Sequence, residues 1–520
     1  MKHKGVVHPD VVSYNSAIKA CGDAGRWEEA LSLLTEMESA GISPDEITYN
    51  SAIKACGDSG QSARALRLLK KMQTEGLSPD MVSYNSAIKA CGDGGQWRAA
   101  LLLLTEMKTK GHLPDIVSYN SAIKACGDAR RLEEALSILT EMQAAGTSPD
   151  MVSYSTAITA CGNAGQPKRA LLLLSEIKAK CRPDNIVYSA AIKVCGDAGQ
   201  WKLGVTLLRE MQAAGISPNE IVYNLAIKAC GQAGQPEQAL SLLMEMRTEG
   251  PSPSTITYNL AVKACGDAGR WREALSLFAE MRRVGVSPDV VSYSTAIEAC
   301  CSGEGGEGYE PALSLLQEMR TKGPYPNKIT YNSVIKVCLN AGRWEESLSY
   351  LTQMKADGII PDVVSYSLAI KACGYAEQPA RAMSLWMEMK AAGISPDIIC
   401  YSTAIKACSS GDGGQAAMAL SLLREMKAKG IPPNEITYNS AIKACGDGGL
   451  LKEALSLLTE MQAAGIPADV ISYSTAINAC ADSGQAERAL SLLMEMKAKG
   501  VSPNEVTYTS AIKALVDAEK

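Results

Sequence analysis

The sequence predicts an all-α fold, a helical-hairpin repeat solenoid or superhelix with about fourteen complete repeats and a final half repeat. Two observations lead to this class. The stretch SYNSAIKACGDAG, from Ser13 to Gly25, returns with small changes about every 35 residues, and each copy carries two apolar stripes at helical spacing. In such arrays each unit packs only against its neighbours, so one continuous core replaces several separate cores.

A tyrosine at one phase of every unit sets the repeat boundaries. The units begin at Val11, Glu46, Met81, Ile116, Met151, Asn185, Glu220, Thr255, Val290, Lys328, Val363, Ile398, Glu435, Val470 and Glu505. Residues 1–10 are interpreted as the tail of a preceding repeat, 11–504 as fourteen tandem repeats, and 505–520 as a partial repeat with its first helix only. Two longer units carry their extra residues in the glycine-rich stretches CSGEGGEGYE and SSGDGGQ, which turns can absorb. We expect the chain to be a piece of a longer array.

Each unit is predicted to contain two helices. One apolar face of the first helix is formed by Val12, Tyr14, Ala17, Ile18 and Cys21. Gly25 then ends this helix, because glycine adopts the left-handed conformation of a helix terminus easily. The second helix carries an apolar stripe of Trp27, Ala30, Leu31, Leu34 and Met37. Gly41 and Pro44 stop it. Periodicity leaves the hand of the superhelix open.

Residues that occur once per unit at a fixed phase indicate core packing. Fourteen of the 17 cysteines fall in one such column, outside which stand Cys181, Cys301 and Cys400. We interpret the column as small buried side chains rather than disulfides or metal ligands, and the tyrosine column likewise as core. The chain has three histidines and no C-x-x-C pair, so no metal site or cofactor is predicted. No apolar run is long enough for a membrane span.

The second residue of every unit is valine or isoleucine. It lies three places before the residue that follows the tyrosine, so the two side chains share a helix face. An apolar side chain there can pack on a flat ring while its neighbour contacts the edge of that ring. The proposed ring-sandwiching residues are Val12, Ile47, Val82, Val117, Val152, Ile186, Ile221, Ile256, Val291, Ile329, Val364, Ile399, Ile436, Ile471 and Val506.

The net charge of -5 argues at first against a polyanionic partner. Charge is distributed unevenly, however, because a lysine stands four places after the variable residue in twelve units, on the same helix face. These predicted phosphate-contacting lysines are Lys19, Lys54, Lys89, Lys124, Lys193, Lys228, Lys263, Lys336, Lys371, Lys406, Lys443 and Lys513. The glutamates fall mostly on the second helix, so the acidic chain is expected to carry a basic stripe.

Units that read VVSYNSAIKACGDAGRWEEALSLLTEMESAGISPD resemble the pentatricopeptide repeat family over residues 11–520. The tyrosine, the turn glycine, the A-L-x-L-L-x-E-M helix and the closing P-D recur in phase. The resemblance implies binding of single-stranded RNA, one base per repeat, read by the fifth and the last residue of each unit. One departure stands at the thirteenth position, where the family commonly has a basic residue and this chain mostly has aspartate, for example Asp23 and Asp58.

The last residue can sort the bases by hydrogen-bonding chemistry. An ionised aspartate only accepts, which suits the ring N–H of uracil and guanine, whereas asparagine or serine can donate to the bare ring nitrogen of adenine and cytosine. Family usage at the fifth position, asparagine for pyrimidines and serine for purines, completes the code; a shorter side chain would make room for the larger ring.

The resemblance therefore assigns each unit one base. The U units are Asn15 with Asp45, Asn50 with Asp80, Asn85 with Asp115, Asn120 with Asp150, Asn259 with Asp289, Asn332 with Asp362, and Asn439 with Asp469. The G units are Ser155 with Asp184 and Ser367 with Asp397. The A units are Ser189 with Asn219, Ser294 with Asn327, Ser402 with Asn434, and Ser474 with Asn504, and the C unit is Asn224 with Ser254. With the family's parallel docking the target reads UUUUGACUAUGAUA.

Two other function classes compete with RNA binding. A helical-repeat scaffold that binds a protein or peptide on its concave face would show irregular variation there, whereas the chain shows a small alphabet at two positions. An enzyme would need a catalytic domain, and the chain has no region outside the repeats to form one. By resemblance, the expected setting is a mitochondrion or plastid, with a role in RNA processing, stabilisation or translation.

Overall fold

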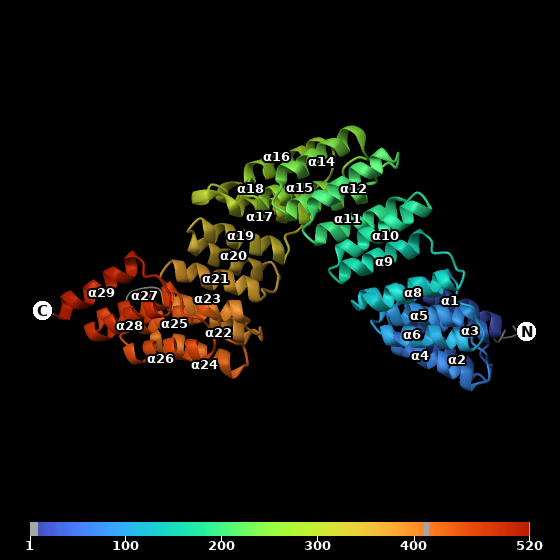
Figure 1. Ribbon diagram of the computed structural model, residues 1–520, viewed down its shortest axis with the longest axis horizontal. Coiled ribbons are helices and arrows are strands. Elements are labelled where there is room, and N and C mark those ends of the chain that lie inside the picture. The colour runs from blue at the N-terminus through green and yellow to red at the C-terminus, as the bar shows by residue number, and fades with distance from the viewer. Residues whose placement is uncertain (1–8, 410–414, 519–520) are drawn as a thin grey trace, which may run out of the picture. The chain divides into compact units, whose positions relative to one another are not determined.

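The computed structural model describes residues 9–409 and 415–518, and these form helices without any strand (Figure 1). The chain divides into two compact units, residues 1–264 and 265–520, and the boundary falls inside α15. The all-α hairpin-repeat prediction is confirmed. Most of the predicted tail at residues 1–10, and most of the SSGDGGQ insertion, lie outside the described residues.

Odd-numbered helices are the first helices of the hairpins. They are α1 (Val11–Asp23), α3 (Glu46–Asp58), α5 (Met81–Asp93), α7 (Ile116–Asp128), α9 (Met151–Asn163), α11 (Asn185–Asp197), α13 (Glu220–Gln232), α15 (Thr255–Asp267), α17 (Val290–Ala299), α19 (Lys328–Asn340), α21 (Val363–Tyr375), α23 (Ile398–Cys408), α25 (Glu435–Asp447), α27 (Val470–Asp482) and α29 (Glu505–Ala518).

Even-numbered helices are the second helices of the hairpins. They are α2 (Trp27–Ser39), α4 (Ser62–Thr74), α6 (Trp97–Thr109), α8 (Leu132–Ala144), α10 (Pro167–Lys180), α12 (Trp201–Ala213), α14 (Pro236–Glu249), α16 (Trp271–Arg283), α18 (Tyr309–Lys322), α20 (Trp344–Ala356), α22 (Pro379–Ala391), α24 (Ala416–Ala428), α26 (Leu451–Ala463) and α28 (Ala486–Ala498). The CSGEGGEGYE insertion forms two short 3-10 turns, η1 (Cys300–Ser302) and η2 (Glu304–Gly306).

Caps and turns explain why the helices begin and end where they do. Asp45 accepts a 2.8 Å hydrogen bond from the backbone N–H of Thr48 and so caps α3. The predicted turn glycine, Gly25, has φ +72°, and Gly41 after the second helix has φ +74°. Arg130 and Glu377 take the turn position with φ 56° and 54°, a conformation that costs a residue with a Cβ more than it costs glycine.

Within each compact unit consecutive first helices such as α3 and α5 pack side by side, and second helices such as α4 pack against their own first helix and the next one. The close approach of consecutive first helices depends on a glycine inside the helix. A methyl group placed on Gly127 would lie 2.7 Å from Cβ of Ala160, and one on Gly231 would lie 2.8 Å from Cβ of Ala264. Most units therefore have a small twelfth residue because the next helix touches it, and Leu339 is an exception.

The tyrosine and cysteine columns lie in the core, as predicted. Tyr84 is fully buried, and its hydroxyl donates to Glu106 of α6 at 3.0 Å. Gln73 of the preceding hairpin also donates to Glu106, at 2.8 Å, so the glutamate joins two units. Burial, together with Glu106, raises the pKa of Tyr84 to about 12. In the cysteine column Cys21 is half-buried and the others are buried, while Cys181 is exposed.

The described helices are all too short or too polar to cross a membrane.

Candidate nucleic-acid interface

The second residue of every unit lies on the surface although it is apolar. All fifteen of these valines and isoleucines are exposed, from 47% for Val152 to 68% for Val12. They belong to the first helices, whose opposite faces carry the buried tyrosines and cysteines. A row of exposed branched side chains, repeated once per hairpin, offers one apolar contact per unit to a ligand.

The fifth and last residues of a unit come together, although 30 positions separate them. The amide nitrogen Nδ2 of Asn15 donates to both carboxylate oxygens of Asp45, at 3.0 and 3.2 Å. The same bond recurs from Asn50 to Asp80 at 3.2 Å and from Asn85 to Asp115 at 3.1 Å. Longer versions, 3.3 to 3.4 Å, join Asn120 to Asp150, Asn332 to Asp362 and Asn439 to Asp469.

A third side chain, which the sequence reasoning missed, holds this pair in place. The hydroxyl of Thr48, the residue before the next tyrosine, donates to Oδ1 of Asn15 at 2.5 Å and to Asp45 at 2.8 Å. Ser83 makes both contacts in the following unit, with Asn50 at 2.5 Å. The recurrence of serine or threonine at this buried position was the signal that could have revealed the contact.

Several of the aspartates at the last position, Asp45 among them, are held in their ionised form. Burial opposes the charge on Asp45, but hydrogen bonds from the backbone and hydroxyl of Thr48 and from Asn15 outweigh it and lower the pKa of the carboxyl. The same balance lowers the pKa of Asp80 and of Asp150. An ionised carboxylate in the groove is an acceptor without a proton to donate.

Units with serine at the fifth position show a different arrangement. Ser294, Ser402 and Ser474 contact the threonine hydroxyl of the next unit at 2.8, 2.8 and 2.6 Å. Elsewhere the serine turns to its own helix, as when Ser155 donates to the carbonyl of Val152 at 3.0 Å. None of the bonds described for these serines reaches the last residue directly.

Two further pairs differ again. Glu220 links Asn224 to Ser254, since it accepts from Nδ2 of the first at 3.4 Å and from the hydroxyl of the second. Ser189 donates to the carbonyl of Asn185 at 2.5 Å, away from Asn219. Asn259 and Asp289 fall in different compact units, so the arrangement of this pair stays a prediction.

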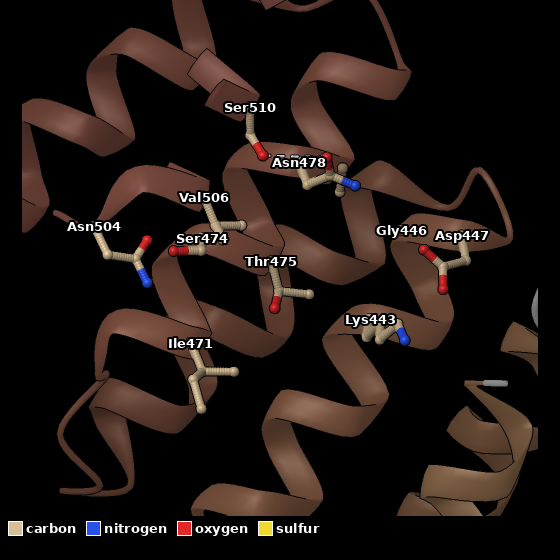
Figure 2. Close-up of a pocket in the computed structure, with 11 residues that line it drawn as sticks. Lys443, Gly446, Asp447, Ile471, Ser474, Thr475, Asn478, Asn504, Val506 and Ser510 are labelled. Atoms are coloured by element: carbon tan, nitrogen blue, oxygen red, sulfur yellow. Dashed lines mark hydrogen bonds between the residues drawn. The ribbon is translucent and has the colours of Figure 1, made fainter. Parts of the chain in front are cut away.

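The same repeat positions line a groove in both compact units. In residues 1–264 a groove of about 490 Å³ is lined by Val117, Val152, Asn120, Asp150, Lys89 and Lys124, among others. In residues 265–520 a groove of about 430 Å³ is lined by the matching Ile471, Val506, Ser474, Asn504 and Lys443 (Figure 2). Both volumes fall within the range of small-ligand sites.

The groove also contains residues that were not predicted. The sixth residue of the unit, Ser121 or Thr475, lies in its wall. The twelfth and thirteenth residues of the preceding unit also line it, Gly92 and Asp93 in one groove and Gly446 and Asp447 in the other. The groove beside Ser474 is not larger than the groove beside Asn120, although a shorter fifth residue was expected to make room. Ser474 is turned onto Thr507, so it adds little open space.

Lys89 and Lys124 line one groove and Lys443 lines the other, but the described lysines of this column do not form an uninterrupted basic stripe. Lys54 contacts Asp23 at 3.0 Å, Lys89 contacts Asp58 at 2.6 Å, and Lys124 contacts Asp93 at 2.5 Å. In each case the carboxylate is the thirteenth residue of the preceding unit. Part of the column is therefore a ladder of ion pairs between neighbouring hairpins, because aspartate replaces the expected basic residue in these units.

The fold and the groove define a modular helical-repeat protein that presents one equivalent surface position per hairpin. The chain belongs to the pentatricopeptide repeat family. The PPR repeat family model matches residues 9–58, 47–93, 79–128, 114–163, 253–302 and 326–375. Related models match 206–268 (pentatricopeptide repeat domain), 152–181 and 186–216 (PPR repeat), and 364–520 (pentacotripeptide-repeat region of PRORP).

Solved structures agree with this assignment. The pentatricopeptide repeat protein PPR10 from maize is 26% identical, with a TM-score of 0.71 over 99% of this chain and 77% of that chain. PPR10 in complex with an 18-nt psaJ RNA element is 25% identical, with a TM-score of 0.61 over 99% of this chain and 83% of that chain. No curated protein sequence matches the chain.

Proposed function

We propose that this protein binds single-stranded RNA and reads one nucleotide per unit through the fifth and last residues, with the target UUUUGACUAUGAUA. The observation that carries the proposal is the recurrence of one groove, built from the same repeat positions, in both compact units. The likeness to PPR10, whose structure was solved with an RNA element, supports the choice of ligand.

The groove supplies the three contacts that a base needs. Exposed Val117 and Val152 offer apolar surfaces to the two faces of a ring. Asp150 can accept from the ring N–H of uracil, and the Nδ2 group of Asn120 has a second hydrogen for a carbonyl oxygen. Asn504 in place of aspartate can donate to the bare ring nitrogen of adenine.

The proposed activity is binding rather than catalysis, because the polar groups that line the grooves, amides, hydroxyls, carboxylates and lysines, suit hydrogen bonds to bases and phosphates. We place the protein in a mitochondrion or plastid, where it would act in RNA processing, stabilisation or translation. Crosslinking in cells followed by sequencing of the bound RNA would identify the transcript and compartment.

The test is competition binding with a labelled UUUUGACUAUGAUA RNA. The expected result is an affinity at least 100-fold higher than for a scrambled RNA of the same composition, given about 1 to 3 kcal/mol per mismatched base. The same sequence as a blunt duplex is the matched control for strand form, and it should not compete. Equal affinity for the target and the scrambled RNA would refute base reading, and no affinity for either would favour a protein or peptide ligand.

A further inference from the structure

The ion-pair ladder along the groove has steps that lack a carboxylate. At five steps among the described residues the thirteenth residue of one unit is an aspartate whose carboxylate lies within 4.0 Å of the lysine ammonium of the next unit, as Asp58 does with Lys89. In the unit that begins at Met151 this residue is Asn163, and in the unit that begins at Lys328 it is Asn340. The lysines that follow these two asparagines are Lys193 and Lys371.

Both asparagines turn away from the lysine and make the same backbone contact. Asn163 donates through Nδ2 to the carbonyl of Gly127 at 3.2 Å, and Asn340 donates to the carbonyl of Cys301 at 2.8 Å. Each carbonyl belongs to the twelfth residue of the preceding unit. Each asparagine therefore donates to a backbone carbonyl of the preceding hairpin, and the lysine of the next unit has no carboxylate partner at this position.

The surroundings of the two lysines agree with this reading. Lys193 is exposed. The carboxylate of Asp197, four residues later on the same helix, lies 4.0 Å from the ammonium of Lys228. Lys371 is also exposed, and its ammonium lies 5.6 Å from the ring centre of Tyr375, which occupies the thirteenth position of its own unit. Among the described residues neither lysine forms an ion pair with a carboxylate.

We propose that the thirteenth residue decides, unit by unit, whether the groove lysine can bind an RNA phosphate, and that Lys193 and Lys371 are the principal phosphate-binding lysines. The proposal rests on the RNA-binding function proposed above. A phosphodiester that approaches Lys89 or Lys124 also meets the carboxylate of Asp58 or Asp93 and is repelled by it. At Lys193 and Lys371 the phosphate meets a positive charge beside a neutral amide.

The experiment measures the affinity for UUUUGACUAUGAUA as a function of KCl concentration, in the full chain and in two paired variants. Each phosphate contact to a single strand contributes roughly -0.7 to the slope of log affinity against log salt. The double variant K193Q/K371Q should flatten the slope by about 1.4. The double variant K89Q/K124Q removes the same charge and should leave the slope nearly unchanged.

Two further variants complete the test. The double variant D58N/D93N releases Lys89 and Lys124 and should steepen the slope by about 1.4. Lys168→Gln removes an exposed lysine from α10 and is the control for net charge. Circular dichroism confirms that each variant is folded.

Equal flattening by K193Q/K371Q and K89Q/K124Q would overturn the inference, and so would a D58N/D93N slope identical to that of the unmodified protein. These outcomes differ from failure of the proposed function, which appears in the unmodified protein as equal affinity for target and scrambled RNA. The salt slopes can still be compared in that case, since they do not depend on base preference.

Discussion

The groove edge is built in two ways. One occurs in the four units over residues 11–150, and the other occurs in the three serine units that begin at Val290, Ile398 and Val470. In the first region an asparagine reaches the last residue directly, as Asn85 reaches Asp115 at 3.1 Å. In the second region the fifth residue forms a hydrogen bond with a threonine hydroxyl of the next unit, as Ser474 does with Thr507. The last residue there, Asn504, caps the next helix by accepting from the Thr507 N–H at 2.9 Å.

The comparison separates two roles of the last residue. Capping is common to both regions, because Asp115 and Asn504 each accept from the backbone three residues later. Of these two regions only the first has the direct link to the fifth residue, a link that the asparagine units beginning at Lys328 and Glu435 also make. Structure and base reading therefore share one side chain, and a substitution can remove either role without the other.

The largest effect is expected from exchanging the last residue between the regions. Asp115→Asn keeps a cap but replaces an acceptor with an amide that can donate, so preference at the third nucleotide should move from U to C. Asn504→Asp should move preference at the fourteenth nucleotide from A to G. Each change should cost the original RNA about 1 to 3 kcal/mol, or roughly 5-fold to 150-fold in affinity.

Competition among four RNAs that differ only at the tested nucleotide measures both exchanges. If the Asp115→Asn variant still selects U at the third nucleotide, the last residue does not read the base. The other thirteen nucleotides act as internal controls and should keep their preferences.

A smaller effect is expected from converting a first-region unit to the serine type. Asn85→Ser removes the direct contact with Asp115 and leaves the carboxylate, so preference at the third nucleotide should move from U towards G. The loss for the U-containing RNA should be about 1 kcal/mol, close to fivefold. Asn85→Gln, which keeps the amide and changes its reach, is the matched control, and an unchanged preference for U in the serine variant would contradict the role of the fifth residue.

The capping role should appear as a local loss of stability without any RNA. Asp115→Ala removes the side chain that caps α7 and should destabilise that helix by about 1 kcal/mol. Amide hydrogen exchange in α7 should accelerate about fivefold, while Asp115→Asn should change it far less. Exchange rates that are equal in the two variants would show that the cap contributes nothing.

The smallest effect near neutral pH concerns the first-region carboxylates. Their hydrogen bonds lower the pKa of Asp45, Asp80 and Asp150 below the unfolded value, so the stability they add is complete above about pH 4 and is lost as the pH falls through the folded pKa values. Thermal unfolding of D45N/D80N/D150N should run parallel to that of the unmodified protein from pH 8 to 5. Below about pH 4 the unmodified protein should lose stability faster, and parallel curves down to pH 3 would contradict the ionised state.

The hairpins were predictable because their signals are local and repeated. Helical spacing identified the buried face of each first helix, and Gly25 marked its end. The column of exposed valines and isoleucines was also predictable, since it shares a helix face with the variable residue. What periodicity could not reveal is which side chains of adjacent units touch, as Thr48 touches Asn15.

Two interpretations of the sequence need revision for that reason. The small alphabet at the last position looked like the mark of base reading alone, but aspartate, asparagine and serine are also the residues that cap helices best. The lysine column looked like a basic stripe, but Asp23 and its equivalents lie within ion-pair distance only once the hairpins are stacked. Both corrections arise from contacts that join one hairpin to the next.

The hydroxyl that bridges Asn15 and Asp45 belongs to Thr48, in the following hairpin. The group of side chains proposed to specify one nucleotide, here called a cassette, therefore spans two hairpins. It begins near the fifth residue of one unit and closes at the third residue of the next. A designer who retargets the array by splicing whole hairpins at the first residues of units, such as Met81 and Ile116, would move Asn85 and Asp115 but leave Ser118 behind. Splice points after the third residue would keep each cassette intact.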